Sequence, residues 1–178
     1  MTSVERARAL AEGLLADVLP VRWTHVQAVA ASANGVADDL GLDVETLVAA
    51  AWLHDVGYAP GVVQTGLHAL DGARFLQGRD VEQRVVTLVA RHSCAPVEAR
   101  LRGLLDQLEG EFPELDQDLA DALCYADMTT GPTGDRVEVE DRLAEIRKRY
   151  GPDDVVTHFI DEAEAEIVAT VRRVDQRR

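Results

Sequence analysis

Helical periodicity is the feature that most constrains this sequence. Apolar residues recur every three to four positions along most of the chain, and no stretch alternates apolar and polar residues for long enough to suggest a sheet. Glycine and proline interrupt the periodic segments and mark where helices end. The sequence therefore predicts an all-α fold in which amphipathic helices pack around one core.

Capping residues and helix stops bound the expected helices. Thr2 and Glu5 have the spacing of a capping box, Asp43 can cap a helix, and Gly41 and Gly78 each follow a periodic segment. The expected helices span about residues 3–18, 21–40, 43–53, 66–77, 80–91, 97–109, 116–128, 138–150 and 153–174.

Composition excludes several classes of protein. Eighteen basic against 32 acidic side chains give a formal charge of −14, which would repel a nucleic-acid backbone, so we expect no nucleic-acid partner. A small anionic substrate would need local positive charge.

The longest apolar runs are far shorter than the roughly 20 residues of a membrane helix, and no signal peptide is evident, so we expect a cytoplasmic protein without a membrane partner. The two cysteines, Cys94 and Cys124, are not paired in spacing, and we expect reduced core residues.

Four of the five histidines lie at helix positions or ends beside apolar segments. One such histidine alone is usually a hydrogen-bonded core residue, but four together favour a shared site. His54 and Asp55 follow the apolar run at 47–53, where burying an imidazole and a carboxylate without partners would be costly. A metal ion would satisfy both. Imidazole and carboxylate suit Mn, Fe, Co, Ni or Zn, and the lack of a cysteine cluster argues against a thiolate zinc site.

These positions make the sequence resemble the HD-domain superfamily of metal-dependent phosphohydrolases, whose pattern is a histidine, a His-Asp pair and a distant aspartate. Two more histidines resemble the extra ligands of the two-metal subgroup. The matching segments are 22–30 with His25, 50–57 with His54 and Asp55, 67–73 with His68, 88–93 with His92, and 123–127 with Asp127. The resemblance covers about residues 20–135. It implies a single compact helical HD domain over 1–178, with the helices of 138–178 packed on the motif core.

The resemblance also implies roles for these residues. His25, His54, Asp55 and Asp127 would hold a first ion, and Asp55 would bridge to a second ion held by His68 and His92. The cofactor would be one or two divalent transition-metal ions, with iron or manganese placed before cobalt, nickel or zinc. Asp55 would be the catalytic residue, as the bridging ligand that orients the attacking water. In the alternative, His68 and His92 only line a mononuclear site.

Candidates for substrate contact are less defined. A lysine that often follows the His-Asp pair in phosphohydrolase members is absent from residues 56–60. Positive charge could come instead from Arg22, Arg91 or Arg136, and Thr130 belongs to a glycine-rich and proline-rich loop just after Asp127. We expect the alternating charges of 138–149 to form a solvated face, and we expect His158 to be no ligand.

Three functions fit this sequence. The first is a metal-dependent phosphohydrolase that cleaves a phosphoester or phosphoanhydride of a small nucleotide-like metabolite, because the ligand order also looks like that of bacterial HD-type dinucleoside-tetraphosphate hydrolases. The second is a di-iron oxygenase, since some HD-domain proteins use a similar set of ligands to activate dioxygen. The third is a metal-binding regulatory domain without turnover. One fold supports many functions, so the sequence leaves the three open.

Overall fold

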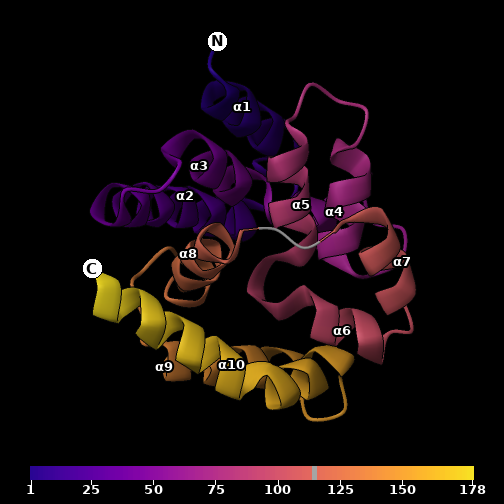
Figure 1. Cartoon of the computed structure of the whole chain (residues 1–178). Helices are drawn as coiled ribbons and strands as arrows, with labels where there is room; N and C mark the ends of the chain where they lie inside the picture. The colour runs from indigo at the N-terminus through magenta and orange to yellow at the C-terminus, as the bar shows by residue number, and fades with distance from the viewer. Residues whose placement is uncertain (114–115) are drawn as a thin grey trace.

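The computed structural model describes residues 1–113 and 116–178, and it confirms the all-α prediction (Figure 1). An isolated antiparallel bridge joins Thr130 to Arg136 in the loop after α8. The elements are α1 (Ser3–Leu15), α2 (Pro20–Leu40), α3 (Val44–Leu53), η1 (Val56–Tyr58), α4 (His68–Leu76), α5 (Gln83–Arg91), η2 (His92–Cys94), α6 (Ala95–Leu101), α7 (Leu105–Glu111), α8 (Gln117–Met128), α9 (Val139–Tyr150) and α10 (Val155–Arg177).

Most helix ends lie where the capping residues predict them. Thr2 and Glu5 form the capping box of α1, and the Asp43 side chain accepts from the Thr46 amide at the start of α3. The single helix predicted over 97–109 is wrong. Gly103 has a φ of +71°, which glycine adopts without steric cost, and the Leu104 amide donates back to the Ala99 carbonyl. This left-handed turn ends α6 and separates it from α7.

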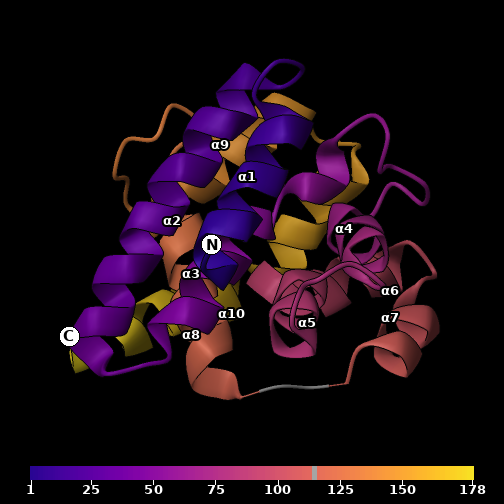
Figure 2. The same cartoon turned by 90° about the horizontal axis from the view of Figure 1, so that it is seen from above.

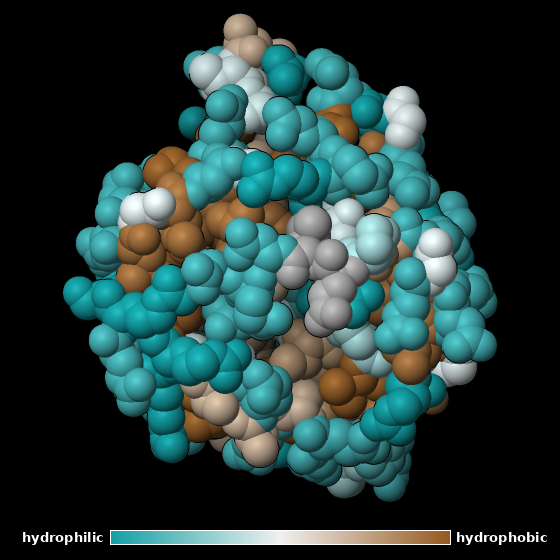
Figure 3. Space-filling model, viewed as in Figure 1, coloured by the Kyte–Doolittle hydropathy of each residue, from teal (hydrophilic) through white to brown (hydrophobic). Residues whose placement is uncertain are grey.

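Helix α3 lies at the centre of the core. It packs against α1, α2, α5 and α8, and its side chains from Thr46 to Ala51 are buried. Figures 1 and 2 show α1 on one side of α3, while α9 and α10 lie together beyond α8. On the face seen in Figure 3, hydrophilic side chains predominate and apolar patches lie between them. The burial of α3 from Thr46 to Ala51 and at Leu53 explains why the His-Asp pair that follows it starts inside the protein.

No helix within residues 1–113 and 116–178 combines the length and the apolar character needed to cross a membrane.

A buried carboxylate shapes the loop that leads into α4. Asp71 is 1% exposed, and it accepts hydrogen bonds from the backbone amides of Gln64, Thr65 and Gly66 at 2.9–3.1 Å. The Thr65 hydroxyl donates to the same carboxylate at 2.7 Å. The loop therefore takes its conformation from Asp71, and it fixes where His68 begins α4.

We expect Asp71→Ala to destabilise the protein by about 3 kcal/mol, because three backbone amides and the Thr65 hydroxyl would lose a charged acceptor. Urea denaturation followed by circular dichroism measures the change. Asp80→Ala is the matched control, since that side chain is 91% exposed and its replacement should change stability by less than about 0.5 kcal/mol. Equal midpoints for the two variants would contradict this role for Asp71.

Candidate metal centre

The six predicted ligands lie together in two groups of three. One group is His25, His54 and Asp127, and the other is Asp55, His68 and His92; within each group the possible ligand atoms lie within 4.8 Å of one another. Five helices supply them. His25 lies within α2, His54 and Asp55 directly follow α3, His68 is the first residue of α4, His92 directly follows α5, and Asp127 lies near the end of α8. Segments far apart in the sequence thus meet at one point.

Backbone carbonyls fix the orientation of three imidazoles. A carbonyl oxygen can only accept, so the ring nitrogen facing it carries the proton and the other nitrogen presents a lone pair. The contacts are His54 Nδ1 to Ala51 O at 2.7 Å, His92 Nδ1 to Val89 O at 2.6 Å, and His25 Nδ1 to Gly131 O at 3.0 Å. This is the arrangement of histidines that bind metal through Nε2.

The Nε2 atoms of His25 and His54 face carboxylate oxygens instead of donors. His54 Nε2 is buried, has no hydrogen-bond partner among the described residues, and lies 3.5 Å from Asp55 Oδ2 and 3.9 Å from Asp127 Oδ1. His25 Nε2 lies 3.1 Å from Asp127 Oδ1. Lone pairs and carboxylate oxygens turned toward one another in a buried site need a proton or a cation between them. The donor set therefore fits a divalent transition-metal ion.

The environment favours the metal-binding protonation states. Burial alone would raise the pKa of Asp55, but Arg22 and the neighbouring imidazoles outweigh it and hold that pKa well below its usual value. Asp127 is likewise kept ionised against burial, with His25 and His54 lowering its pKa. Burial lowers the pKa of His54, and burial together with His92 lowers that of His68 to about 3. Charged carboxylates and neutral imidazoles are the forms that bind metal.

Ser93 is a site residue that the sequence did not reveal. Its hydroxyl donates to Asp127 Oδ2 at 2.5 Å, so it holds one oxygen of that carboxylate while the other faces the histidines. Ser93 and Cys94 have φ values of +47° and +62°, which are unfavourable for residues with a side chain. This turn between α5 and α6 directs Ser93 toward Asp127. A serine beside His92 was the available signal, but the sequence did not indicate the turn.

We expect Ser93→Ala to weaken metal affinity by roughly 10- to 100-fold, because a partner that orients a ligating carboxylate would be lost. Titration of the metal-free protein with Mn²⁺ or Co²⁺ measures the effect. Ser93→Gly provides the control: it also removes the hydroxyl but relaxes the strained backbone. Both variants should lose affinity alike, and wild-type affinity in Ser93→Gly would attribute the effect to the backbone instead.

A cavity of about 60 Å³ borders the centre and contains arginines from two parts of the chain. Arg22, one of the predicted substrate contacts, lines this cavity, with its guanidinium 2.5 Å from Asp55 Oδ2 and 3.5 Å from the centre of the Tyr58 ring. Arg142 and Arg149 reach the same cavity from α9. The prediction of a solvated face over 138–149 is wrong at Arg142, which is 6% exposed. Helical spacing places Arg142, Ile146 and Arg149 on one face of α9. This face is hard to recognise in the sequence, because charges of both signs alternate along the segment.

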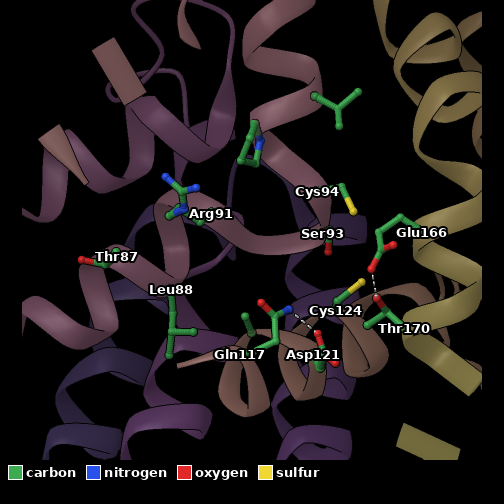
Figure 4. Close-up of a pocket in the computed structure, with 13 residues that line it drawn as sticks. Thr87, Leu88, Arg91, Ser93, Cys94, Gln117, Asp121, Cys124, Glu166 and Thr170 are labelled. Atoms are coloured by element: carbon green, nitrogen blue, oxygen red, sulfur yellow. Dashed lines mark hydrogen bonds between the residues drawn. The ribbon is translucent and has the colours of Figure 1, made fainter. Parts of the chain in front are cut away.

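The other predicted contact residues lie elsewhere. Arg91 donates to the Phe112 carbonyl at 3.1 Å and lines a separate cavity of about 270 Å³, toward which Cys94 and Cys124 also point (Figure 4). The Thr130 hydroxyl donates to Ala126, Arg136 donates to the Tyr125 hydroxyl, and both line a hollow beside α2. None of these three lines the cavity at the metal centre. Their contact with substrate stays an untested prediction.

The two cysteines are free, and burial raises both thiol pKa values, that of Cys94 to about 11. At neutral pH both are therefore protonated thiols, which are poor nucleophiles and poor metal ligands.

Comparison with known proteins agrees with this geometry. The family model described as the HD domain matches residues 22–130, which is more than half of the chain. The chain is 33% identical over 75 residues to a tRNA (cytidine(56)-2'-O)-methyltransferase of Thermoplasma volcanium, covering 42% of this chain and 22% of that protein. It is 35% identical over 92 residues to the protein of the same name from Picrophilus torridus, covering 50% and 26%. The chain thus spans about a quarter of the length of these relatives. No solved structure matches it.

Proposed function

This chain belongs to the HD-domain family, and from that premise we propose that it is a metal-dependent phosphohydrolase. The observation that carries the proposal is the pair of ligand groups, in which buried imidazoles and carboxylates converge and the buried His54 Nε2 has no hydrogen-bond partner among the described residues. The two groups are adjacent, because Asp55 of one lies 3.5 Å from His54 of the other. This arrangement favours two neighbouring divalent ions over one.

Bound there, such ions would polarise a phosphoryl group and activate water for attack on phosphorus. His25, His54 and Asp127 would hold one ion, His68 and His92 the other, and Asp55 would bridge them. Arg22, Arg142 and Arg149 would supply the local positive charge that a phosphate needs in a chain with a formal charge of −14. These arginines would thus supply the positive charge that a lysine after the His-Asp pair often supplies in phosphohydrolases and that residues 56–60 lack.

We propose a small phosphorylated metabolite as the substrate. Its nucleotide-like character is supported by the likeness of the ligand order to dinucleotide hydrolases, which is an argument by analogy. We do not carry the methyl transfer named for the two relatives over to this chain, because it spans only about a quarter of each of them.

Release of inorganic phosphate tests the proposal. The metal-free protein is loaded with Mn²⁺, Co²⁺ or Fe²⁺ and incubated with a panel of nucleoside phosphates, dinucleoside polyphosphates and simple phosphomonoesters. Turnover with Mn²⁺ or Co²⁺ in the absence of dioxygen is the expected result, since hydrolysis needs neither dioxygen nor electron transfer. Turnover confined to the iron form, together with oxygen consumption, would indicate an oxygenase. Metal binding without any product would indicate a regulatory domain.

A further inference from the structure

The metal cavity has an apolar neighbour. A second cavity of about 270 Å³ shares Arg22, His25, Arg142 and Arg149 with it. The remaining residues that line this outer cavity are all apolar: Val18, Leu19, Pro20, Val21 and Pro132. Three arginines therefore line both the inner cavity at the candidate ligands and the outer cavity, whose other residues belong mainly to the turn between α1 and α2 and to the start of α2.

Exposed apolar side chains mark the outer cavity. Val18 is 56% exposed and Val21 is 61% exposed, and they are two of the four large apolar side chains that the described residues leave exposed. A single exposed valine needs no explanation. Two of them line a hollow that shares three arginines with the cavity at the candidate ligands, which matches the usual composition of a ligand site, largely apolar with a few polar groups.

The arginines at the junction are incompletely neutralised. Arg142 and Arg149 share one carboxylate, that of Glu145, at 2.5 Å and 3.5 Å. Arg142 is 6% exposed, and its Nε atom is buried without a hydrogen-bond partner among the described residues. A buried guanidinium with an unused donor is costly unless a ligand accepts from it. An oxygen of a bound phosphate would satisfy this donor and balance the second positive charge.

The two cavities differ in size, and each can therefore hold a different part of a ligand. Ligand pockets usually enclose roughly 300–1,000 Å³, so the inner cavity of about 60 Å³ suits only the phosphoryl end of a ligand. We infer that the substrate spans both cavities, with its phosphoryl group at the metal ligands and an uncharged, largely apolar group against Val18 and Val21. The substrate class is thus a phosphate ester or anhydride with an apolar or aromatic group, such as an alkyl chain or a base. The inference rests on the proposed phosphohydrolase function.

Binding of alkylphosphonates tests the inference without requiring turnover, because their carbon–phosphorus bond resists hydrolysis. Calorimetric titration compares methylphosphonate with hexylphosphonate on the Mn²⁺-loaded protein. We expect hexylphosphonate to bind about tenfold more tightly, because its added methylenes leave water for the outer cavity. Equal affinities would overturn the inference.

Substitutions assign the preference to the outer cavity. The double variant Val18→Ser plus Val21→Ser should reduce the tenfold ratio to about twofold, because it replaces the apolar wall. Val63→Ser is the matched control: this valine is 48% exposed and lines neither cavity, so the ratio should stay at about ten. An unchanged ratio in the double variant would place the alkyl chain elsewhere and overturn the inference.

The phosphonate and hydrolysis experiments together distinguish failure of the inference from failure of the proposed function. Hexylphosphonate preference combined with no phosphate release from any ester would retain the two-cavity ligand site and reject hydrolysis. Phosphate release combined with equal phosphonate affinities would retain hydrolysis and reject the apolar subsite. Absence of phosphonate binding to the metal-loaded protein would reject the subsite whatever the hydrolysis assay shows.

Discussion

Replacing His54 and Asp55 together by alanine is expected to abolish metal binding and to lower phosphate release on the order of 10³-fold or more. The pair contributes one ligand to each group, so the double variant leaves two candidate ligands in each. Metal content per chain, measured after purification without chelator, should fall from about two ions in the wild type to near zero. A wild-type protein that takes up no metal even after reconstitution would contradict the proposed catalytic function.

A matched control separates this effect from a general loss of histidine and aspartate. His158→Ala plus Asp153→Ala removes the same two chemical groups from exposed positions, and it should keep the metal content of the wild type. Folding of the test variant needs checking as well, since Arg22 loses the carboxylate that it contacts at 2.5 Å. Unchanged helical circular dichroism with no bound metal is the expected combination. Metal retained at the wild-type level in a folded test variant would place the ions elsewhere.

The cluster of candidate ligands was predictable because several local signals agreed. His54 and Asp55 end a fully apolar run, His92 closes a periodic segment, and helix ends are where a buried chain can present polar groups to a shared centre. The order of the ligands then matched a known family. Each signal is local in the sequence, and the fold only had to bring the helix ends together.

The arginines that line the cavity at the candidate metal centre could not be predicted in the same way. Arg91 is adjacent to His92 in sequence, yet it lines another cavity, because α5 ends at Arg91 and the backbone of His92 is extended. Arg142 is remote in sequence from every ligand, yet it lines the centre because α9 packs there. Proximity in sequence is thus a poor guide to which arginine lines the cavity at the candidate metal centre. Ser93 was missed for a related reason, since its direction depends on a left-handed turn.

Gly57→Ala is expected to destabilise the protein by more than about 4 kcal/mol, which is at the severe end for one substitution. A Cβ at this position would lie 1.8 Å from the His68 carbonyl oxygen and 2.8 Å from the Gly72 amide nitrogen. Both are backbone atoms, so no rotamer change can relieve the overlap, and η1 would have to separate from α4. For a protein of this size the melting temperature should fall by roughly 10 °C or more.

Gly35→Ala is the control for this variant. Gly35 lies inside α2, and a Cβ added there would meet no heavy atom within 4 Å beyond the backbone of its own helix. Alanine there should stabilise the helix by about 0.5–1 kcal/mol. The two glycine variants therefore have opposite expected signs in the same thermal or urea denaturation experiment. A similar stability of both would show that η1 and α4 are not held at the distance seen here.

The close contact between Gly57 and the His68 carbonyl also affects the position of two candidate metal ligands. Gly57 lies two residues after Asp55, and the carbonyl that it approaches belongs to His68, so the contact sets how near these two ligands lie. If Gly57→Ala remains folded at low temperature, the separation of η1 from α4 should draw Asp55 and His68 apart. The variant should then lose metal from the group of Asp55, His68 and His92 first and retain about one ion per chain. Metal analysis of the folded variant at low temperature would show two ions per chain if the contact did not position these ligands.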